Sequence, residues 1–182
     1  MHEEKKRTDV WLVFAGTLDL PISRSALNVF TKASQDGIET IHFLIQSQGG
    51  DVNEGVFLYN LIREFPMNVI TYNCGFVGSA AATAYLGAKK RVVSANGTFL
   101  LHKVTAGVGR TGNALTLKSI RDNVALDDAR TENIIKSHLR LSEEQLSVHA
   151  NSDLFLSEQD AIDCGLATDI GDFSPRGLIL NI

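Results

Sequence analysis

The chain has 182 residues, of which 44% are hydrophobic and 21% are charged, and its formal net charge is −4. This length allows one domain with its own core, and the composition excludes a disordered chain. No basic surface is indicated, so nucleic acid is not an expected partner. Two cysteines, Cys74 and Cys164, are too few for a disulfide framework and lack metal-ligand spacing, and we expect both to be reduced and buried.

The amino end is charged, and no apolar run follows it that is long enough for a signal peptide. No stretch approaches the roughly 20 apolar residues of a membrane span. We therefore expect a cytoplasmic protein that does not enter a membrane, with a flexible arm over residues 1–9 and a single domain over residues 10–182.

Strands and helices alternate along the chain, which indicates an α/β fold with largely parallel strands. In the first half, the pattern predicts strands over residues 10–15, 40–45 and 68–72, and helices over residues 23–34 and 52–65. Asp51 can cap the second of these helices, and Pro66 ends it. A glycine turn over residues 75–78 then leads into a helix over residues 79–88.

In the second half, two short strands over residues 91–93 and 98–101 are joined through Asn96-Gly97, a strong turn signal. The glycine-dotted segment 106–112 lacks the Lys-Ser/Thr ending of a phosphate-binding loop, which favours a flexible loop. A long helix is predicted over residues 114–139, about 40 Å in length. The alternative is two shorter helices with a break near Asp127-Asp128. Two more helices follow, one from the capping box at 142–145 and one over 157–163.

Three side chains could form the site of a nucleophilic hydrolase. Ser79 begins a helix of small residues, where the helix dipole favours developing negative charge. His102 ends an apolar strand and could take the Ser79 proton. Asp153 could fix the tautomer of His102. Each has an ordinary alternative: a helix cap for Ser79, a core histidine for His102, and a turn or capping residue for Asp153.

Two backbone amides could complete this site. Gly49-Gly50 follows a buried strand, and glycine lets the backbone turn sharply and approach a substrate closely. The amides of Gly50 and Ala80 could then form an oxyanion hole, the alternative being an ordinary strand-to-helix turn. Lys103 is disfavoured as a base because it should point away from the His102 face. The remaining histidines are expected to have solvated, core or packing roles, and these are His2, His42, His138 and His149.

In order and spacing, four segments resemble the proteolytic subunit family of the Clp protease. The resemblance extends from about residue 10 to 170, and the segments are 46–50, 75–84, 99–102, and 153–157 with Gly165-Leu166. It implies a crotonase-like spiral of ββα units with a protruding handle helix at about 114–139. It also implies that Ser79 is the nucleophile, His102 the general base and acid, and Asp153 the orienting carboxylate. Gly50 and Ala80 match the family's oxyanion-hole amides.

The same resemblance implies a serine endopeptidase that hydrolyses peptides or unfolded polypeptides inside a chamber of homo-oligomeric rings. It implies no metal or bound cofactor, and it implies an AAA+ unfoldase as partner. The sequence departs from the family at Gln48, where Pro is usual, and at Lys103-Val104, where Gln-Pro follows the histidine. Leu154 stands where the family often has an arginine that helps ring-to-ring contact. These departures leave the triad unchanged and bear on substrate binding and ring stacking.

Two other functions stay open on the sequence. One is a catalytically silent Clp-like scaffold subunit, although such relatives usually lack one of the three residues. The other is a crotonase-type acyl-CoA enzyme, which would use the same two amides to hold a thioester enolate. That chemistry usually employs Glu or Asp bases near the amides instead of a Ser-His-Asp set.

Overall fold

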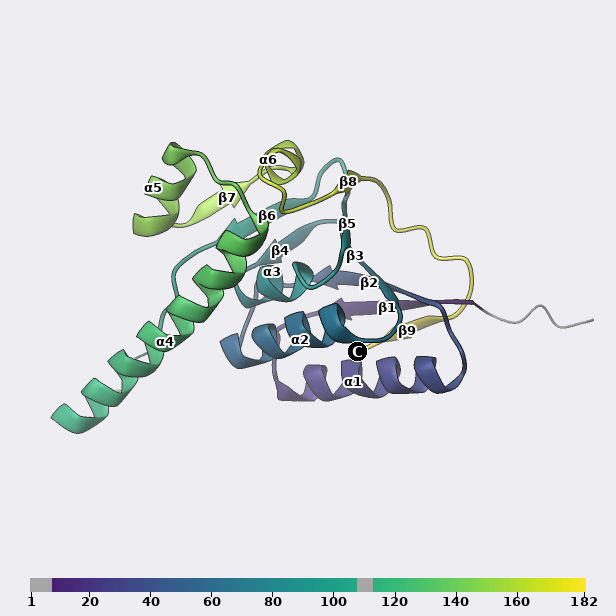
Figure 1. Ribbon diagram of the computed structural model, residues 1–182, viewed down its shortest axis with the longest axis horizontal. Coiled ribbons are helices and arrows are strands. Elements are labelled where there is room, and N and C mark those ends of the chain that lie inside the picture. Colours follow the sequence, from purple (N-terminus) through teal and green to yellow (C-terminus); the bar gives the residue numbers. More distant parts are fainter. Residues whose placement is uncertain (1–7, 108–112) are drawn as a thin grey trace, which may run out of the picture.

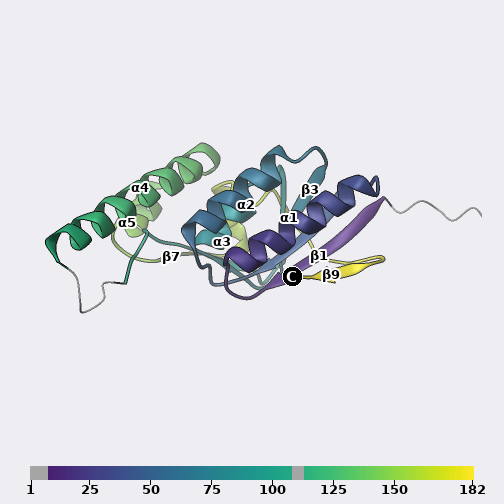
Figure 2. The same cartoon turned by 90° about the horizontal axis from the view of Figure 1, so that it is seen from below.

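The computed structural model describes residues 8–107 and 113–182 (Figure 1). Most of the expected amino-terminal arm (1–9) and of the glycine segment (106–112) therefore lies outside the described residues. Where the description begins, the chain enters a strand at Asp9. A long helix projects from one end of an α/β body in both views (Figures 1 and 2).

The main body is a six-stranded sheet in which every pair of neighbouring strands is parallel, as expected for alternating strands and helices. Its strands, in spatial order, are β8 (Asp169–Ile170), β5 (Lys90–Val93), β3 (Asn68–Asn73), β2 (Thr40–Gln46), β1 (Asp9–Ala15) and β9 (Ile179–Asn181). In β2, Ile41, Phe43 and Ile45 are buried and alternate with half-buried side chains. This alternation places the core on one face of the sheet.

Helices α1 (Leu20–Gln35) and α2 (Val52–Glu64) pack beside each other (Figure 2). The first begins three residues earlier than predicted because Asp19 caps it, accepting the Ile22 amide at 3.1 Å, and Pro21 occupies the first turn. Asp51 caps the second as predicted, accepting the Asn53 amide at 2.7 Å. The short α3 (Ala80–Tyr85) is buried along its whole length.

A second, three-stranded sheet carries the parts of the candidate site. It consists of β4 (Phe76–Gly78), β6 (Thr98–Leu101) and β7 (Leu154–Leu156), with β4 parallel and β7 antiparallel to β6. One expectation is corrected here, because the predicted glycine turn over 75–78 contains the strand β4. Asn96-Gly97 connects β5 with β6 as predicted, and these strands belong to different sheets, because β5 pairs with β3 and β6 pairs with β4.

The projecting helix is α4 (Ala114–His138), one continuous helix of 25 residues. The alternative with a break near Asp127-Asp128 is therefore wrong, since both residues lie inside the helix. Asn113 caps it by accepting the Thr116 amide at 2.9 Å. The helices α5 (Glu143–Asn151) and α6 (Glu158–Asp163) follow, and each begins with a capping box.

Both cysteines are free, but only Cys164 is buried, so the expectation of two buried thiols is wrong for Cys74. This residue lies in the turn between β3 and β4 and is exposed. Within the described ranges, no helix is both long enough and apolar enough to cross a membrane.

Candidate active site

Ser79 stands between β4 and α3 in an unusual backbone conformation. Its φ is 53° and its ψ is −129°, and it is the one non-glycine residue with positive φ among the described residues. Its amide donates to the Leu100 carbonyl of β6 at 2.8 Å. Although Ser79 occupies the N-cap position of α3, its side chain makes no capping hydrogen bond. The ordinary reading of Ser79 as a helix cap therefore does not hold, and its hydroxyl is free of that role.

Two glycines pack closely around this turn. A Cβ at Gly49, where φ is +110°, would lie 2.7 Å from the Cβ of Ser79. A Cβ at Gly50 would lie 2.1 Å from the Leu18 carbonyl oxygen. Since real Cβ atoms do not approach other atoms so closely, both positions require glycine, and the Gly-Gly pair is what lets this turn lie against the serine.

Ser79 and His102 line one cavity. Gly50, from the glycine turn, and Ala80, the first residue of α3, line the same cavity, and these are the two residues expected to supply amides. His102 follows β6 directly and is half-buried. The other residues that line the cavity are the apolar Val52, Leu101, Val104 and Ile135 and the threonines Thr83, Thr105 and Thr131. The structure thus brings together four of the five residues expected at the site.

Asp153, the fifth residue, does not line this cavity, and it is exposed. The antiparallel pairing of β6 with β7 ends with Leu101 opposite Leu154, so His102 and Asp153 are the residues that directly flank this last pair. Among the described residues, however, no hydrogen bond joins Ser79 to His102 or His102 to Asp153.

The hydrogen bonds of the glycine pair distinguish its two amides. The Gly49 amide donates to Ser47 Oγ at 3.0 Å, and the Gly49 carbonyl accepts from the Leu18 amide at 2.9 Å. The Gly50 and Ala80 amides, in contrast, find no acceptor within the part of the chain that the structure describes. Gly50 is exposed and Ala80 is buried, and two amides without an acceptor among the described residues, lining the same cavity as Ser79, are suited to receive an oxyanion.

Lys103 follows His102, and its side chain forms ion pairs with two carboxylates of α4. Its Nζ lies 2.7 Å from Glu132 Oε1 and 3.5 Å from Asp128 Oδ2. Burial acts to lower the pKa of Lys103, but the two carboxylates outweigh it and the pKa is raised. A lysine held protonated cannot serve as a base, which agrees with the expectation that Lys103 is not the base.

The three other described histidines pack against neighbours away from the cavity. His42 stacks on Trp11, with ring centroids 4.7 Å apart, and its Nδ1 lies 2.8 Å from the Tyr72 hydroxyl. His138 bonds the Tyr59 hydroxyl at 2.9 Å. Burial lowers the pKa of both His42 and His138. His149 is buried and contacts Glu132. These roles match the packing roles expected from the sequence.

A comparison with protein families decides the relationship of this chain. The Clp protease family model matches residues 15–173. The chain belongs to the Clp protease family. The match runs from the last residue of β1 to the segment after β8 and leaves out β9, and it includes the residues that line the cavity around Ser79 and the strand that leads to His102.

Two relatives illustrate the degree of similarity. An ATP-dependent Clp protease proteolytic subunit of Paracoccus denitrificans is 27% identical over 157 residues, which cover 85% of this chain and 78% of the relative. An ATP-dependent Clp protease proteolytic subunit 2 of Pseudomonas aeruginosa is 28% identical over 146 residues, covering 79% of this chain and 70% of the relative.

A solved structure shows the same fold. A mutant of ClpP1 from Listeria monocytogenes superposes with a TM-score of 0.77 at 22% identity and covers 90% of this chain and 91% of that chain. The crotonase-like α/β fold that the resemblance implied is therefore confirmed.

Proposed function

We propose that this protein is a serine endopeptidase that cleaves peptides or unfolded polypeptides with Ser79, His102 and Asp153. The observation that carries the proposal is the shared cavity, which is lined by Ser79, whose hydroxyl makes no capping hydrogen bond, by the half-buried His102, and by two residues whose amides have no acceptor among the described residues. The names of the curated relatives, proteolytic subunits of the Clp protease, support the same class of reaction.

In the proposed reaction, His102 takes the proton of Ser79 as its oxygen attacks the carbonyl carbon of the scissile peptide bond. The carbonyl oxygen becomes an oxyanion, which the amides of Gly50 and Ala80 would bind. His102 then gives the proton to the leaving amine, and an acyl-enzyme forms on Ser79. Water hydrolyses this ester by the same route. Asp153 would hold the imidazole in the tautomer that accepts the serine proton.

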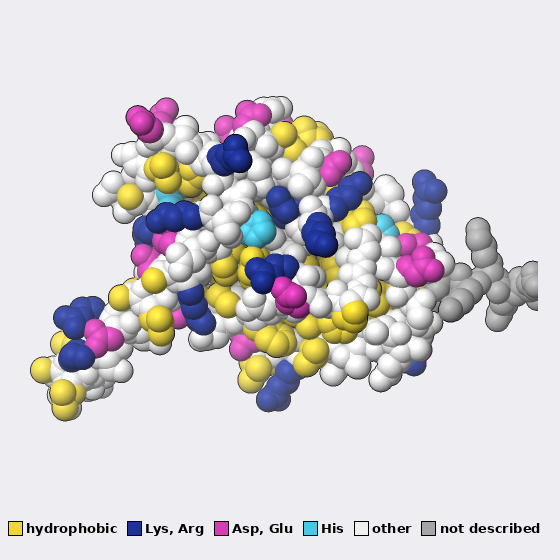
Figure 3. All heavy atoms as spheres, viewed as in Figure 1, with side chains coloured by type: hydrophobic (Ala, Val, Ile, Leu, Met, Phe, Trp, Pro, Cys, Tyr) yellow, Lys and Arg dark blue, Asp and Glu magenta, His cyan; other side chains and the backbone are white. Residues whose placement is uncertain are grey.

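The proposal includes assembly into rings that enclose the site, and service by an AAA+ unfoldase. Support for assembly comes from α4, whose exposed side chains include Leu115, Leu117 and Leu126. Figure 3 shows hydrophobic side chains at the surface of the projecting helix. Exposed apolar side chains on a projecting element are typical of an association surface. The name of the relatives, ATP-dependent Clp protease proteolytic subunit, supports an ATPase partner.

One observation favours a second function, a catalytically silent scaffold subunit. The described residues contain no hydrogen bond between Ser79 and His102 or between His102 and Asp153. Catalytic hydrogen bonds are often long in unliganded enzymes and tighten when substrate binds, which is why the peptidase remains the preferred function.

Hydrolysis of a fluorogenic peptide by the assembled protein tests the two functions against each other. A peptidase requires turnover by the wild type and its loss in Ser79→Ala, by about 10³-fold or more. An assembled wild type with no turnover on a panel of peptides would leave the scaffold as the function, and turnover that survives in Ser79→Ala would contradict the role of Ser79 as the nucleophile.

A further inference from the structure

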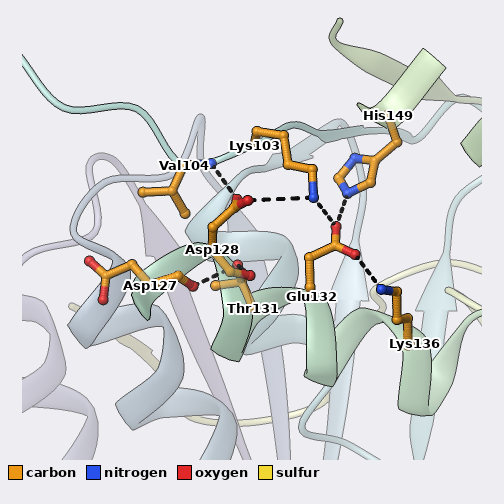
Figure 4. Close-up of polar contacts among 8 residues, drawn as sticks. All are labelled: Lys103, Val104, Asp127, Asp128, Thr131, Glu132, Lys136 and His149. Carbon is orange, nitrogen blue, oxygen red and sulfur yellow. Dashed lines mark hydrogen bonds and ion pairs between the residues drawn. The ribbon is translucent and has the colours of Figure 1, made fainter. Parts of the chain in front are cut away.

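One carboxylate on α4 collects contacts from three parts of the chain. Glu132 Oε1 accepts from Lys103 Nζ at 2.7 Å and from His149 Nε2 at 2.6 Å, and Lys136 Nζ lies 3.2 Å from its Oε2 (Figure 4). One turn earlier on the same face, Asp128 Oδ1 accepts the Val104 amide at 3.0 Å. We call Lys103, Asp128, Glu132 and His149 the handle cluster.

The handle cluster contacts the chain close to His102 and to the helix that leads to Asp153, the two candidate triad residues other than Ser79. Lys103 and Val104 come directly after His102, where β6 has ended and the strand ladder no longer fixes the backbone. His149 lies in the last turn of α5, the helix that leads to Asp153. Figure 4 shows Lys103 and His149 approaching Glu132 from these two segments. Both segments are therefore tied to the same side chain of α4.

The side chains of Glu132 and His149 are largely buried, so the loss of a contact between them would leave a buried polar group without a partner. The side chain of Glu132 is 16% exposed and that of His149 is 5% exposed. Within the described residues His149 Nδ1 has no partner, so Glu132 supplies the side-chain contact of this histidine. Burial acts to raise the pKa of Glu132, but hydrogen bonds from Lys103, His149 and Lys136 lower it to about 2. The carboxylate is thus charged, and withdrawal of one partner leaves the others poorly satisfied.

We propose that Glu132 is a positioning residue that sets the relative placement of His102 and Asp153 by holding Lys103 and His149 together. This inference rests on the proposed peptidase function and adds to it a role for the handle helix within one subunit. It also gives a function to Lys103-Val104, which stand where the family usually has Gln-Pro. Such positioning matters because a displacement of about 1 Å at a reacting group can reduce a rate by about 100-fold.

The test compares Lys103→Met and Glu132→Gln with a matched control, Asp122→Asn. Asp122 lies on the same helix and pairs with Lys118 and Arg121, but all three side chains are exposed. We expect kcat for a fluorogenic peptide to fall by about 10- to 100-fold in the first two variants, with KM changed by less than about twofold. Lys103→Arg, which keeps the cation, should recover most of the kcat, and Asp122→Asn should match the wild type.

Crystal structures of the wild type and Lys103→Met test the proposal without an activity assay, because they show the position of His102 directly. We expect His102 to move by about 1 Å relative to Ser79 in the variant. Folded variants with wild-type kcat and an unmoved His102 would overturn the proposal. If Glu132→Gln does not fold, Lys103→Met decides, because Glu132 then keeps His149 and Lys136. If the wild type itself cleaves no peptide, the proposed function fails, and the position of His102 alone decides the positioning role.

Discussion

The backbone of Ser79 adopts a conformation that side-chain-bearing residues rarely occupy, with φ of 53° and ψ of −129°. Such conformations cost about 1–3 kcal/mol and persist only where surrounding contacts enforce them. Here the Ser79 amide is bonded to Leu100 of β6, and its carbonyl accepts from the amides of Ala82 and Thr83. These contacts fix the backbone of Ser79, whose side chain makes no capping hydrogen bond and which lines the same cavity as His102.

Asp153 is the residue whose role depends most on the proposed reaction. We expect Asp153→Asn to fold normally, because the side chain is exposed and has no hydrogen-bond partner among the described residues. If the aspartate orients His102, kcat should fall by about 10²- to 10⁴-fold with little change in KM. Steady-state peptide hydrolysis measures this, and Asp163→Asn, a change at another aspartate away from the cavity, is the control. A wild-type kcat in Asp153→Asn would remove this residue from the triad.

The sequence predicts the main strands and helices well where they are long, and poorly where they are short. Strands β8 and β9 have two and three residues, too few to show periodicity, and neither was predicted. Asn96-Gly97 is typical of a hairpin, but tertiary pairing sends its two strands into different sheets. Local patterns do not report such pairings.

The same limit applies to the site. Ser79, His102, Gly50 and Ala80 could be chosen from the sequence because each stands at the end of a recognisable element. That His102 and Asp153 both flank the last pair of the β6–β7 ladder depends on the register of these strands, which only the fold supplies. Glu132 was missed because an acidic residue on a charged helix normally indicates a solvated face. Its partners Lys103 and His149 come from distant segments, and no local signal connects them.

At the scale of elements, α4 projects from the body and also carries Glu132, the proposed positioning residue of the candidate site. Its carboxyl-terminal half carries Asp128 and Glu132 toward the segment after His102, whereas its amino-terminal half carries exposed leucines. One helix therefore links the surface available for association with the geometry of the cavity.

The charge of Glu132 should make the stability contributed by the handle cluster depend on pH. The pKa of Glu132 falls from its ordinary value of 4.5 to about 2 on folding, because hydrogen bonds from Lys103, His149 and Lys136 outweigh burial. A depressed folded-state pKa adds stability above pH 4.5 that is lost as the pH falls toward 2. The free energy of unfolding should thus differ by about 2–3 kcal/mol between wild type and Glu132→Gln at pH 7.

Denaturant unfolding of both proteins between pH 7 and pH 3 measures this difference. We expect the difference in the free energy of unfolding to stay constant down to about pH 5 and then to shrink. Protonation neutralises the Glu132 carboxylate in the wild type, and Glu132→Gln has already removed that charge. Asp122→Asn should show a smaller difference at pH 7. A gap between wild type and Glu132→Gln that does not change with pH would contradict the assignment of the stabilisation to the Glu132 charge.

At the scale of the whole molecule, the proposed rings need an association surface, and two features bear on where it lies. Leu154, at the position where the family often has a ring-contacting arginine, is 5% exposed and packs inside the molecule. It therefore offers no charged group to a second ring. The exposed leucines of α4 are the better candidate for contact between rings (Figure 3).

Leu126, which is 66% exposed, provides a test of that surface. If α4 packs against another subunit, Leu126→Glu should lower the mass of the native assembly, because a charge buried in an apolar contact is costly. Thr31→Glu adds the same charge at an exposed position of α1, outside α4, and should leave the mass unchanged. Native mass spectrometry distinguishes these outcomes. A wild type that is a monomer at working concentration, or an unaltered assembly in Leu126→Glu, would contradict this role of α4.

The central claim is that Ser79 is an activated nucleophile, and covalent labelling tests it most directly. The assembled protein is treated with a fluorophosphonate, and the intact mass and the labelled peptide are determined. We predict one adduct per chain, located on Ser79, absent from Ser79→Ala and formed much more slowly in His102→Ala. An assembled wild type that gains no adduct, or one whose adduct remains in Ser79→Ala, would contradict the account.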